Sequence, residues 1–310
     1  MEIFAGWQSI FVLMILIAIG FILARKRWFD ESTSALFSRL VINITLPAMM
    51  LNNVTDYFEL EQIREIGFGF FLILLTMAIN FGVALASIRL FRIPQGKQGV
   101  YACMFSLSNT IFIGLPVNVA LFGEAIIPYV LVYFVANTIM LWTVGVYLIR
   151  KDAHPETRFT LASLRKVFTP PLISFLVAVL LTILNIPIPS LVLETSRMIG
   201  GMTTPLATFY IGIVMESLPV REIRISKPMI LVVLGRNIIA PSVVFAIFYS
   251  LQFPPLMRNV FVIMSAMPVM TQTVILSRAY DSDQNLAALG AFVTTIISLA
   301  AIPIYMMLLS

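Results

Sequence analysis

The sequence has little charge. Of its 310 residues only 11% are charged, whereas 60% are hydrophobic, and the mean hydropathy is +0.98. A soluble globular domain carries roughly a quarter of charged residues. Too few polar side chains are present to cover a water-soluble surface, so lipid must be the solvent for most of this chain.

Reactive side chains are equally scarce. The chain has one cysteine, Cys103, within an apolar run, and one histidine, His154, in a loop. One cysteine excludes a disulfide within the chain, and no cysteine or histidine cluster is available to bind a metal or to form a nucleophilic pair. We therefore expect neither an enzyme nor a metal or cofactor site, and basic loops between apolar runs indicate topology signals rather than nucleic-acid binding.

The apolar residues fall into ten segments separated by charged residues or by proline and glycine. A membrane-spanning helix needs about 20 mostly apolar residues, and every segment is long enough. Residues 1–24 have no basic region before their apolar stretch, so we expect a first spanning helix rather than a cleaved signal. We predict an all-α polytopic membrane protein with ten transmembrane helices. The segments are 5–24, 34–53, 67–88, 99–121, 126–149, 169–186, 191–216, 229–251, 257–280 and 286–309.

Acidic side chains are missing from the middle of all ten segments. This absence disfavours a proton relay through buried carboxylates and a carboxylate-rich sodium site. A substrate protonated in solution, or a sodium site built from carbonyls and hydroxyls, remains compatible with the sequence.

Basic residues concentrate in the odd-numbered connections between segments, which predicts that these connections face the cytoplasm and that both termini are extracytoplasmic. The even connections contain Arg64, and Arg258 borders the eighth. The basic residues of the odd connections are Arg25, Lys26, Arg27, Arg89, Arg92, Lys97, Arg150, Lys151, Arg158, Arg165, Lys166, Arg221, Arg224 and Lys227.

The longest polar connection, 151–168, divides the chain into a first half, 1–150, and a second half, 169–310. Five spans per half force the two halves into opposite orientations. Proline motifs also occur in matching segments: the second carries Thr45-Leu46-Pro47 and the seventh carries Thr204-Pro205. We therefore predict two inverted five-helix repeats, an organisation typical of secondary transporters.

The fourth and ninth segments carry the strongest candidate site. Proline inside a helix removes a backbone hydrogen bond, and in lipid the freed carbonyls must find other partners. If both segments unwind and cross near the midplane, their helix N-termini attract an anion such as a carboxylate. The alternative for each segment is an ordinary proline kink. The predicted substrate-binding residues in these segments are Asn109, Thr110, Gly114, Pro116, Pro268, Thr271 and Gln272.

Four further residues complete the predicted site. Arg236 lies within the eighth segment, where an arginine costs at least ~2.5 kcal/mol on insertion scales. It either provides counter-charge for the substrate or a coupling element, or it extends to the cytoplasmic edge. Asn43 and Thr45 are expected to line the site from the second segment, and Pro205 from the seventh. Asn137, in the fifth segment, is expected to form interhelical hydrogen bonds.

Five motifs in order resemble the auxin efflux carrier family over essentially the whole chain. They are residues 43–48 (NITLPA), 108–116 (SNTIFIGLP), 204–207 (TPLA), Arg236 with Pro241, and 266–268 (AMP). The resemblance is to the bacterial branch of malonate and malate permease-like proteins, which is related to plant PIN-type carriers.

The resemblance implies a scaffold domain and a transport domain, with broken helices four and nine crossing at a bound carboxylate. It places Asn109 and Pro116 at the fourth-helix crossover and Pro268 at the ninth, and Arg236 matches a position often basic in the family. Thr271 and Gln272 stand where many bacterial members have asparagine, so their polar contacts are expected to differ. The short fifth connection does not imply plant-type phosphorylation control.

These observations together predict a secondary active transporter of a small organic anion, such as a mono- or dicarboxylate, in the cell (inner) membrane. Transport would proceed by alternating access through an elevator or rocking motion. A proton or sodium ion as coupling ion is left open, as is a homodimer. The alternatives are a sodium-coupled symporter of the bile-acid-symporter type and a non-transporting membrane sensor.

Overall fold

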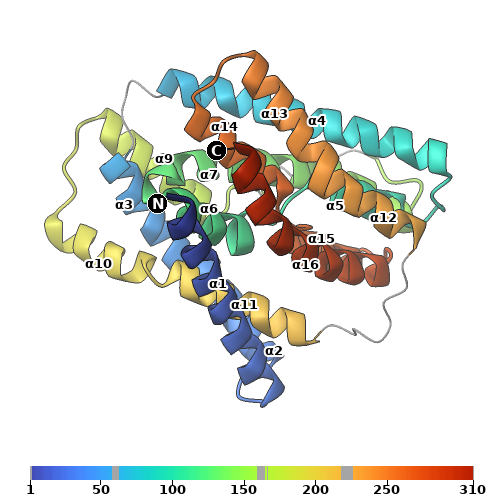
Figure 1. Cartoon of the computed structure of the whole chain (residues 1–310), viewed down its shortest axis with the longest axis horizontal. Helices are drawn as coiled ribbons and strands as arrows, with labels where there is room; N and C mark the ends of the chain where they lie inside the picture. Colours follow the sequence, from blue (N-terminus) through green and yellow to red (C-terminus); the bar gives the residue numbers. More distant parts are fainter. Residues whose placement is uncertain (1, 58–62, 159–164, 166, 218–225, 310) are drawn as a thin grey trace. The chain divides into compact units, whose positions relative to one another are not determined.

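The structure, a computed structural model, describes residues 2–57, 63–158, 165, 167–217 and 226–309. These residues form α-helices joined by short π-helical turns and tight connections (Figure 1). Within this part of the chain no strand is present, and one isolated antiparallel bridge joins Ser108 to Val269. The predicted all-α class is confirmed. Lys166, Arg221 and Arg224 of the charge pattern lie outside the described residues.

The helices follow the predicted segments in order. The first half contains α1 (Glu2–Arg25), α2 (Glu31–Leu40), η1 (Val41–Thr45), α3 (Leu46–Tyr57), α4 (Ile63–Phe91), α5 (Gln98–Ser106), η3 (Thr110–Gly114), α6 (Leu115–Phe122), η4 (Glu124–Ile126), α7 (Ile127–Met140), η5 (Leu141–Gly145) and α8 (Val146–Ala153). The second half contains α9 (Pro170–Ile183), α10 (Ser190–Gly200), α11 (Thr203–Ser217), α12 (Lys227–Leu234), η8 (Gly235–Ile239), α13 (Ala240–Ser250), α14 (Pro255–Ala266), α15 (Thr271–Ala279) and α16 (Gln284–Leu309).

Six helical stretches in the described chain are long and apolar enough to cross a membrane. They are Glu31–Asn52, Ile66–Phe91, Glu124–Ala153, Ser190–Ser217, Lys227–Ser250 and Gln284–Leu309. Four shorter apolar helices are Phe11–Arg25, Thr110–Phe122, Pro170–Ile183 and Pro255–Ala266. Several spans establish a multi-pass membrane protein, while the number ten stays a prediction.

The chain folds into two compact units, each assembled from three separate stretches. Unit 1 comprises Met1–Gly67, Ile111–Leu131 and Phe168–Ser217. Unit 2 comprises Phe68–Thr110, Val132–Val167 and Leu218–Ser310. Neither unit coincides with one half of the sequence, because each takes helices from both halves.

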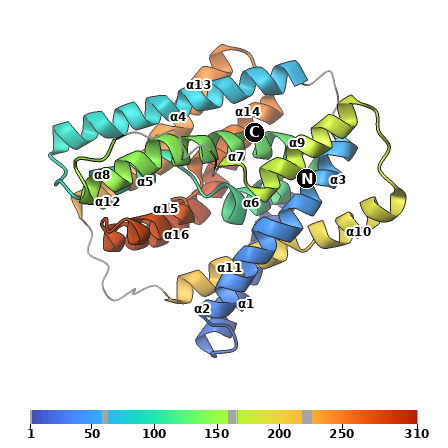
Figure 2. The same ribbon diagram turned by 180° about the vertical axis from the view of Figure 1, so that it is seen from behind.

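In unit 1, α1 and α11 pack closely side by side (Figures 1 and 2). Glycine makes this approach feasible on both helices. A Cβ at Gly20 of α1 would lie 2.7 Å from the carbonyl oxygen of Phe209, and one at Gly212 of α11 would clash with the carbonyl oxygen of Ile17. Small residues at helix contacts are the usual means of close packing between membrane helices.

In unit 2, α5 is the central helix, and its residues from Gly99 to Ser106 are buried. Helices α8, α12, α15 and α16 pack around it. The carboxylate of Asp152, at the end of α8, accepts hydrogen bonds from the backbone N–H groups of Gly99 (2.8 Å) and Val100 (3.0 Å). It also accepts one from the Ser282 hydroxyl (2.7 Å), so one carboxylate ties the start of α5 to the α15–α16 connection.

The entry to α2 shows a local sequence signal that the structure uses directly. Asp30 is the N-cap, and its carboxylate accepts hydrogen bonds from the Ser32 hydroxyl and from the backbone N–H and hydroxyl of Thr33. These bonds favour the ionised carboxylate and lower the pKa of Asp30 to about 2. The cap satisfies N–H groups that the first helical turn leaves unpaired.

Gly212→Ala is expected to destabilise the protein by about 1–3 kcal/mol, because the added methyl group would overpack the α1–α11 contact against backbone that cannot move aside. The test is the thermal unfolding midpoint in detergent. Gly82→Ala is the matched control, since no described atom lies within 4 Å of a Cβ there. Equal midpoints for Gly212→Ala and wild type would contradict the proposed packing.

Candidate functional site

The fourth segment is interrupted between α5 and η3. Helix α5 ends at Ser106, and Leu107 has extended backbone angles (φ −110°, ψ 136°). The π-helical turn η3 begins at Thr110 and leads into α6. The break therefore covers residues 107–109, and it contains no proline.

The ninth segment is interrupted in a similar way between α14 and α15. Helix α14 ends at Ala266, and Met267 is extended (φ −64°, ψ 155°). Proline disfavours the helical conformation in the residue before it, which accounts for the end of the helix directly before Pro268. Helix α15 then begins at Thr271.

The two breaks pair with each other. The backbone N–H of Asn109 donates to the carbonyl of Pro268 at 2.8 Å, and Ser108 faces Val269 in an antiparallel bridge. In this arrangement the N–H and C=O of Ser108 point away from the opposite strand. A bridge this short therefore leaves outward-facing polar groups on both of its edges.

Side chains from two other helices form hydrogen bonds with the backbone groups on these edges. The Asn137 side chain of α7 accepts from the Ser108 N–H (3.2 Å) and donates to the Ser108 carbonyl (3.0 Å). On the other edge, the Thr294 hydroxyl of α16 accepts from the Val269 N–H (3.0 Å). The interhelical hydrogen bonding expected of Asn137 is confirmed.

The carbonyls at the C-terminal ends of α5 and α14 are bound mainly by Arg236. This arginine is fully buried in η8 and donates to the carbonyls of Phe105 (3.4 Å), Ser265 (2.5 Å) and Met267 (2.9 and 3.2 Å). The Ser298 hydroxyl of α16 donates to the Ala266 carbonyl (3.0 Å). Arg236 therefore does not extend to the cytoplasmic edge, because its guanidinium binds inside unit 2.

The polar residues predicted for the crossing are brought together in part. The Asn109 side-chain amide donates to the Thr271 hydroxyl at 2.9 Å. Asn109 and Thr110 are buried, while Thr271 and Gln272 are partly exposed in the first turn of α15. Unit 2 thus contains Asn109, Thr110, Pro268, Thr271, Gln272 and Arg236.

The remaining predicted residues belong to unit 1. Gly114 ends η3, and Pro116 lies in the first turn of α6. The buried Thr45 hydroxyl accepts from the Thr203 hydroxyl at 2.9 Å, which links η1 to α11. The exposed Asn43 donates from its side chain to the Arg39 carbonyl of its own helix, and Pro205 is exposed.

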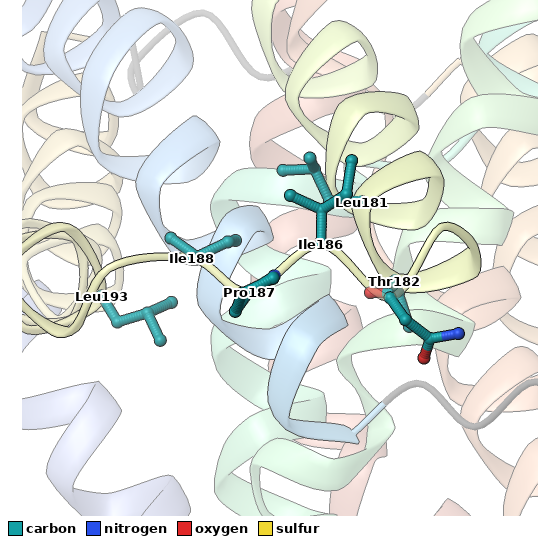
Figure 3. Close-up of a pocket in the computed structure, with 7 residues that line it drawn as sticks. Leu181, Thr182, Ile186, Pro187, Ile188 and Leu193 are labelled. Atoms are coloured by element: carbon teal, nitrogen blue, oxygen red, sulfur yellow. The ribbon is translucent and has the colours of Figure 1, made fainter.

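Two cavities are lined by residues other than those of the paired breaks. One, of about 260 Å³, lies at the connection between α9 and α10, where Leu181, Ile186, Ile188 and Leu193 surround it (Figure 3). The other, of about 530 Å³, is an apolar groove of unit 2 lined largely by α13 and α16. Neither is lined by a charged side chain.

Among the described residues, no group of three or more histidine, cysteine, aspartate or glutamate side chains lies close enough to bind a metal ion. The donors at the crossing are amides, hydroxyls, backbone groups and one guanidinium. Such a set suits an anion or a polar organic group better than a transition metal.

Sequence reasoning missed Thr294 and Ser298, which support the crossing, and Asp152, which ties the start of α5 to the α15–α16 connection. Thr294 and Ser298 are four residues apart in a largely apolar helix, so they lie on one face, and that spacing was an available signal. Asp152 gave no such signal, because a carboxylate at the end of a predicted span is normally interpreted as a solvated surface residue.

Asn137→Ala is expected to destabilise the protein by about 1–3 kcal/mol, because it leaves the buried N–H and C=O of Ser108 without their side-chain partner. Thermal unfolding in detergent measures the loss. Thr138→Val is the control, since within the described chain the buried Thr138 hydroxyl bonds to the Phe134 carbonyl of its own helix and to no other segment. If the control lost as much as Asn137→Ala, support of the break by Asn137 would be ruled out.

Comparison with known proteins agrees with a membrane carrier. The model of the membrane transport protein family matches residues 6–306. An uncharacterized transporter of Methanothermobacter thermautotrophicus is 25% identical over 303 residues, covering 97% of this chain and 98% of the relative. An uncharacterized transporter of Methanocaldococcus jannaschii is 23% identical over 301 residues, covering 96% of each chain.

The family match spans nearly the whole chain, both relatives are named transporters, and the fold is an apolar helical one with several spans. The chain therefore belongs to the membrane transport protein family, that of the auxin efflux carriers, and is a transporter rather than an enzyme.

Proposed function

We propose that this transporter is a secondary active carrier of a small organic anion, such as a mono- or dicarboxylate. The observation that carries the proposal is the hydrogen bond between the Asn109 amide and the Thr271 hydroxyl, at the start of α15. A helix N-terminus carries partial positive charge, and anions commonly bind there. Asn109, Thr110, Thr271 and Gln272 would supply hydrogen bonds that orient a carboxylate.

Two buried hydroxyls support a polar ligand near the crossing. Ser106, the last residue of α5, and Thr273, in the first turn of α15, have side-chain oxygens with no hydrogen-bond partner in the described chain. Buried polar atoms in proteins are nearly always paired, so unpaired ones near a candidate site favour a ligand that completes them. These hydroxyls would also suit a sodium ion bound without carboxylates, which keeps sodium coupling open beside proton coupling.

The same proposal includes ten spans arranged as two inverted repeats, residues 1–150 and 169–310. Each of the ten predicted segments overlaps one of the six spans or one of the four shorter helices. The two breaks occur in matching segments, four and nine. Thr45 and Thr203, from matching segments two and seven, bond to each other. Asn137 and Thr294, from segments five and ten, satisfy opposite edges of the crossing.

Alternating access would follow from motion of unit 2 as the transport domain, with unit 1 as the scaffold. Unit 1 contains predicted segments one, two, six and seven, and unit 2 contains segments three, eight, nine and ten with most of five. The polar bonds of the crossing lie within unit 2. The Asp152 hydrogen bonds and the Lys97–Asp283 ion pair (3.0 Å) join its helix ends, as a domain that moves as one body requires.

Purified protein in liposomes is expected to transport at least one of labelled malonate, malate and indole-3-acetate. Asn109→Ala and Thr271→Ala should each lower kcat/KM roughly 10- to 100-fold, the effect of losing a hydrogen bond to a charged group. Imposed pH and sodium gradients, tested separately, identify the coupling ion.

The matched control is Asn285→Ala, an exposed asparagine of unit 2 in the first turn of α16. It should transport at the wild-type rate. Absence of transport of all three anions, or wild-type kinetics in both site variants, would contradict the anion site.

The proposed location is the cell (inner) membrane, with both termini extracytoplasmic. Single cysteines at Lys151 and Glu124, both exposed, test this orientation, because the native Cys103 is buried and unreactive. A membrane-impermeant maleimide should label Glu124→Cys in intact cells and Lys151→Cys only after permeabilisation. The reverse pattern would invert the topology.

A further inference from the structure

Arg236 differs from an ordinary substrate-binding arginine in what it contacts. Its side chain is fully buried, and its three nitrogens donate to carbonyls at 2.5–3.4 Å. Within the described chain no carboxylate forms an ion pair with it. Its hydrogen-bond partners in the described chain are therefore backbone carbonyls, and its side chain is closed to solvent.

The three carbonyls belong to two helix ends. Phe105 is in the last turn of α5, and Ser265 and Met267 lie at the end of α14. The last four carbonyls of a helix have no partner within it and carry partial negative charge. The C-terminal ends of α5 and α14 approach each other here, and the hydrocarbon core of a membrane offers their free carbonyls no hydrogen-bond donor.

A guanidinium is well matched to this position. It is planar, permanently charged, and presents five N–H donors in fixed directions, so it can bind carbonyls from two helices at once. Gly235 makes the approach feasible, since a Cβ there would clash with the Phe105 ring. The Tyr305 hydroxyl donates to the carbonyl of Asn237, the next residue of the same π-helical turn.

We infer that Arg236 is a positioning residue for transport: it joins the C-terminal ends of α5 and α14 and thereby fixes the Asn109–Thr271 pair, without binding the substrate. For its effect on transport the inference rests on the proposed function. Its structural part can be tested without any substrate.

The substrate-free test is hydrogen–deuterium exchange of purified wild type, Arg236→Lys and Arg236→Met. We expect Arg236→Met to raise exchange about 10-fold or more in peptides that contain Asn109 and Val269, whose N–H groups bond across and beside the crossing. The α1 and α11 peptides of unit 1 should exchange as in wild type. Arg258→Met is the control. Arg258 lies on α14, the helix whose C-terminal end Arg236 binds, but its guanidinium lies over the Phe245 and Tyr249 rings.

Arg236→Lys keeps the test decisive if Arg236→Met does not fold. An ammonium group keeps the charge but does not span both helix ends, so exchange should rise at one break and stay near wild type at the other. Wild-type exchange at both breaks in either folded variant would overturn the inference. So would a uniform rise over all of unit 2, because that would indicate general destabilisation.

Transport specificity separates positioning from substrate binding. For Arg236→Lys, kcat/KM should fall for malonate and for indole-3-acetate by the same factor, because the arginine does not contact the carboxylates of the substrate. A change of 10-fold or more in the ratio of the two kcat/KM values would show direct carboxylate binding and overturn the inference. If wild type transports none of malonate, malate and indole-3-acetate, the proposed function fails, and the exchange experiment still decides the role of Arg236.

Discussion

The hydrogen-bonding requirement of the backbone in lipid governs the centre of unit 2. Two helices, α5 and α14, stop within apolar segments, and the N–H and C=O groups freed there have no water to bind. The chain satisfies them by pairing the breaks and by directing four side chains at what remains: Asn137, Thr294, Ser298 and Arg236. The packing around α5, with its close glycine contacts, brings these side chains within reach.

The same arrangement decides where charge can be bound. The ends of α5 and α14 are negative, and uncompensated they would repel an anion at the crossing. Arg236 neutralises both ends from inside the unit. The N-terminal end of α15, with Asn109 and Thr271 beside it, carries the partial positive charge that the proposed anion site would use. If the proposed anion site is correct, it depends on a residue that need not touch the anion.

Hydropathy and proline chemistry predicted the helical class, the order of the segments and the break before Pro268, because these depend on local physics. The break after Ser106 has no proline, and Pro116 lies in the first turn of α6, where proline is well tolerated. For Arg236, the sequence alone allowed two roles: a place in the site, or a side chain that extends to the cytoplasmic edge. Either role would lower the free-energy cost of placing an arginine in a membrane helix, so the sequence does not separate them. The partners of Asn137 and Thr294 are 29 and 25 residues away in the chain, and no local pattern encodes such pairs.

The boundary between the two units bears on how motion of unit 2 would reach the crossing. The first stretch of unit 2 ends at Thr110, one residue after Asn109, and the second stretch of unit 1 begins at Ile111. That step falls at the start of the π-helical turn η3, a form often found at functional sites. If unit 2 moves as the transport domain, η3 must absorb part of the displacement directly beside the Asn109 amide. The pairing of Asn109 with Pro268 and Thr271 would oppose that strain, so the bonds at the proposed site would also limit how far the motion displaces Asn109.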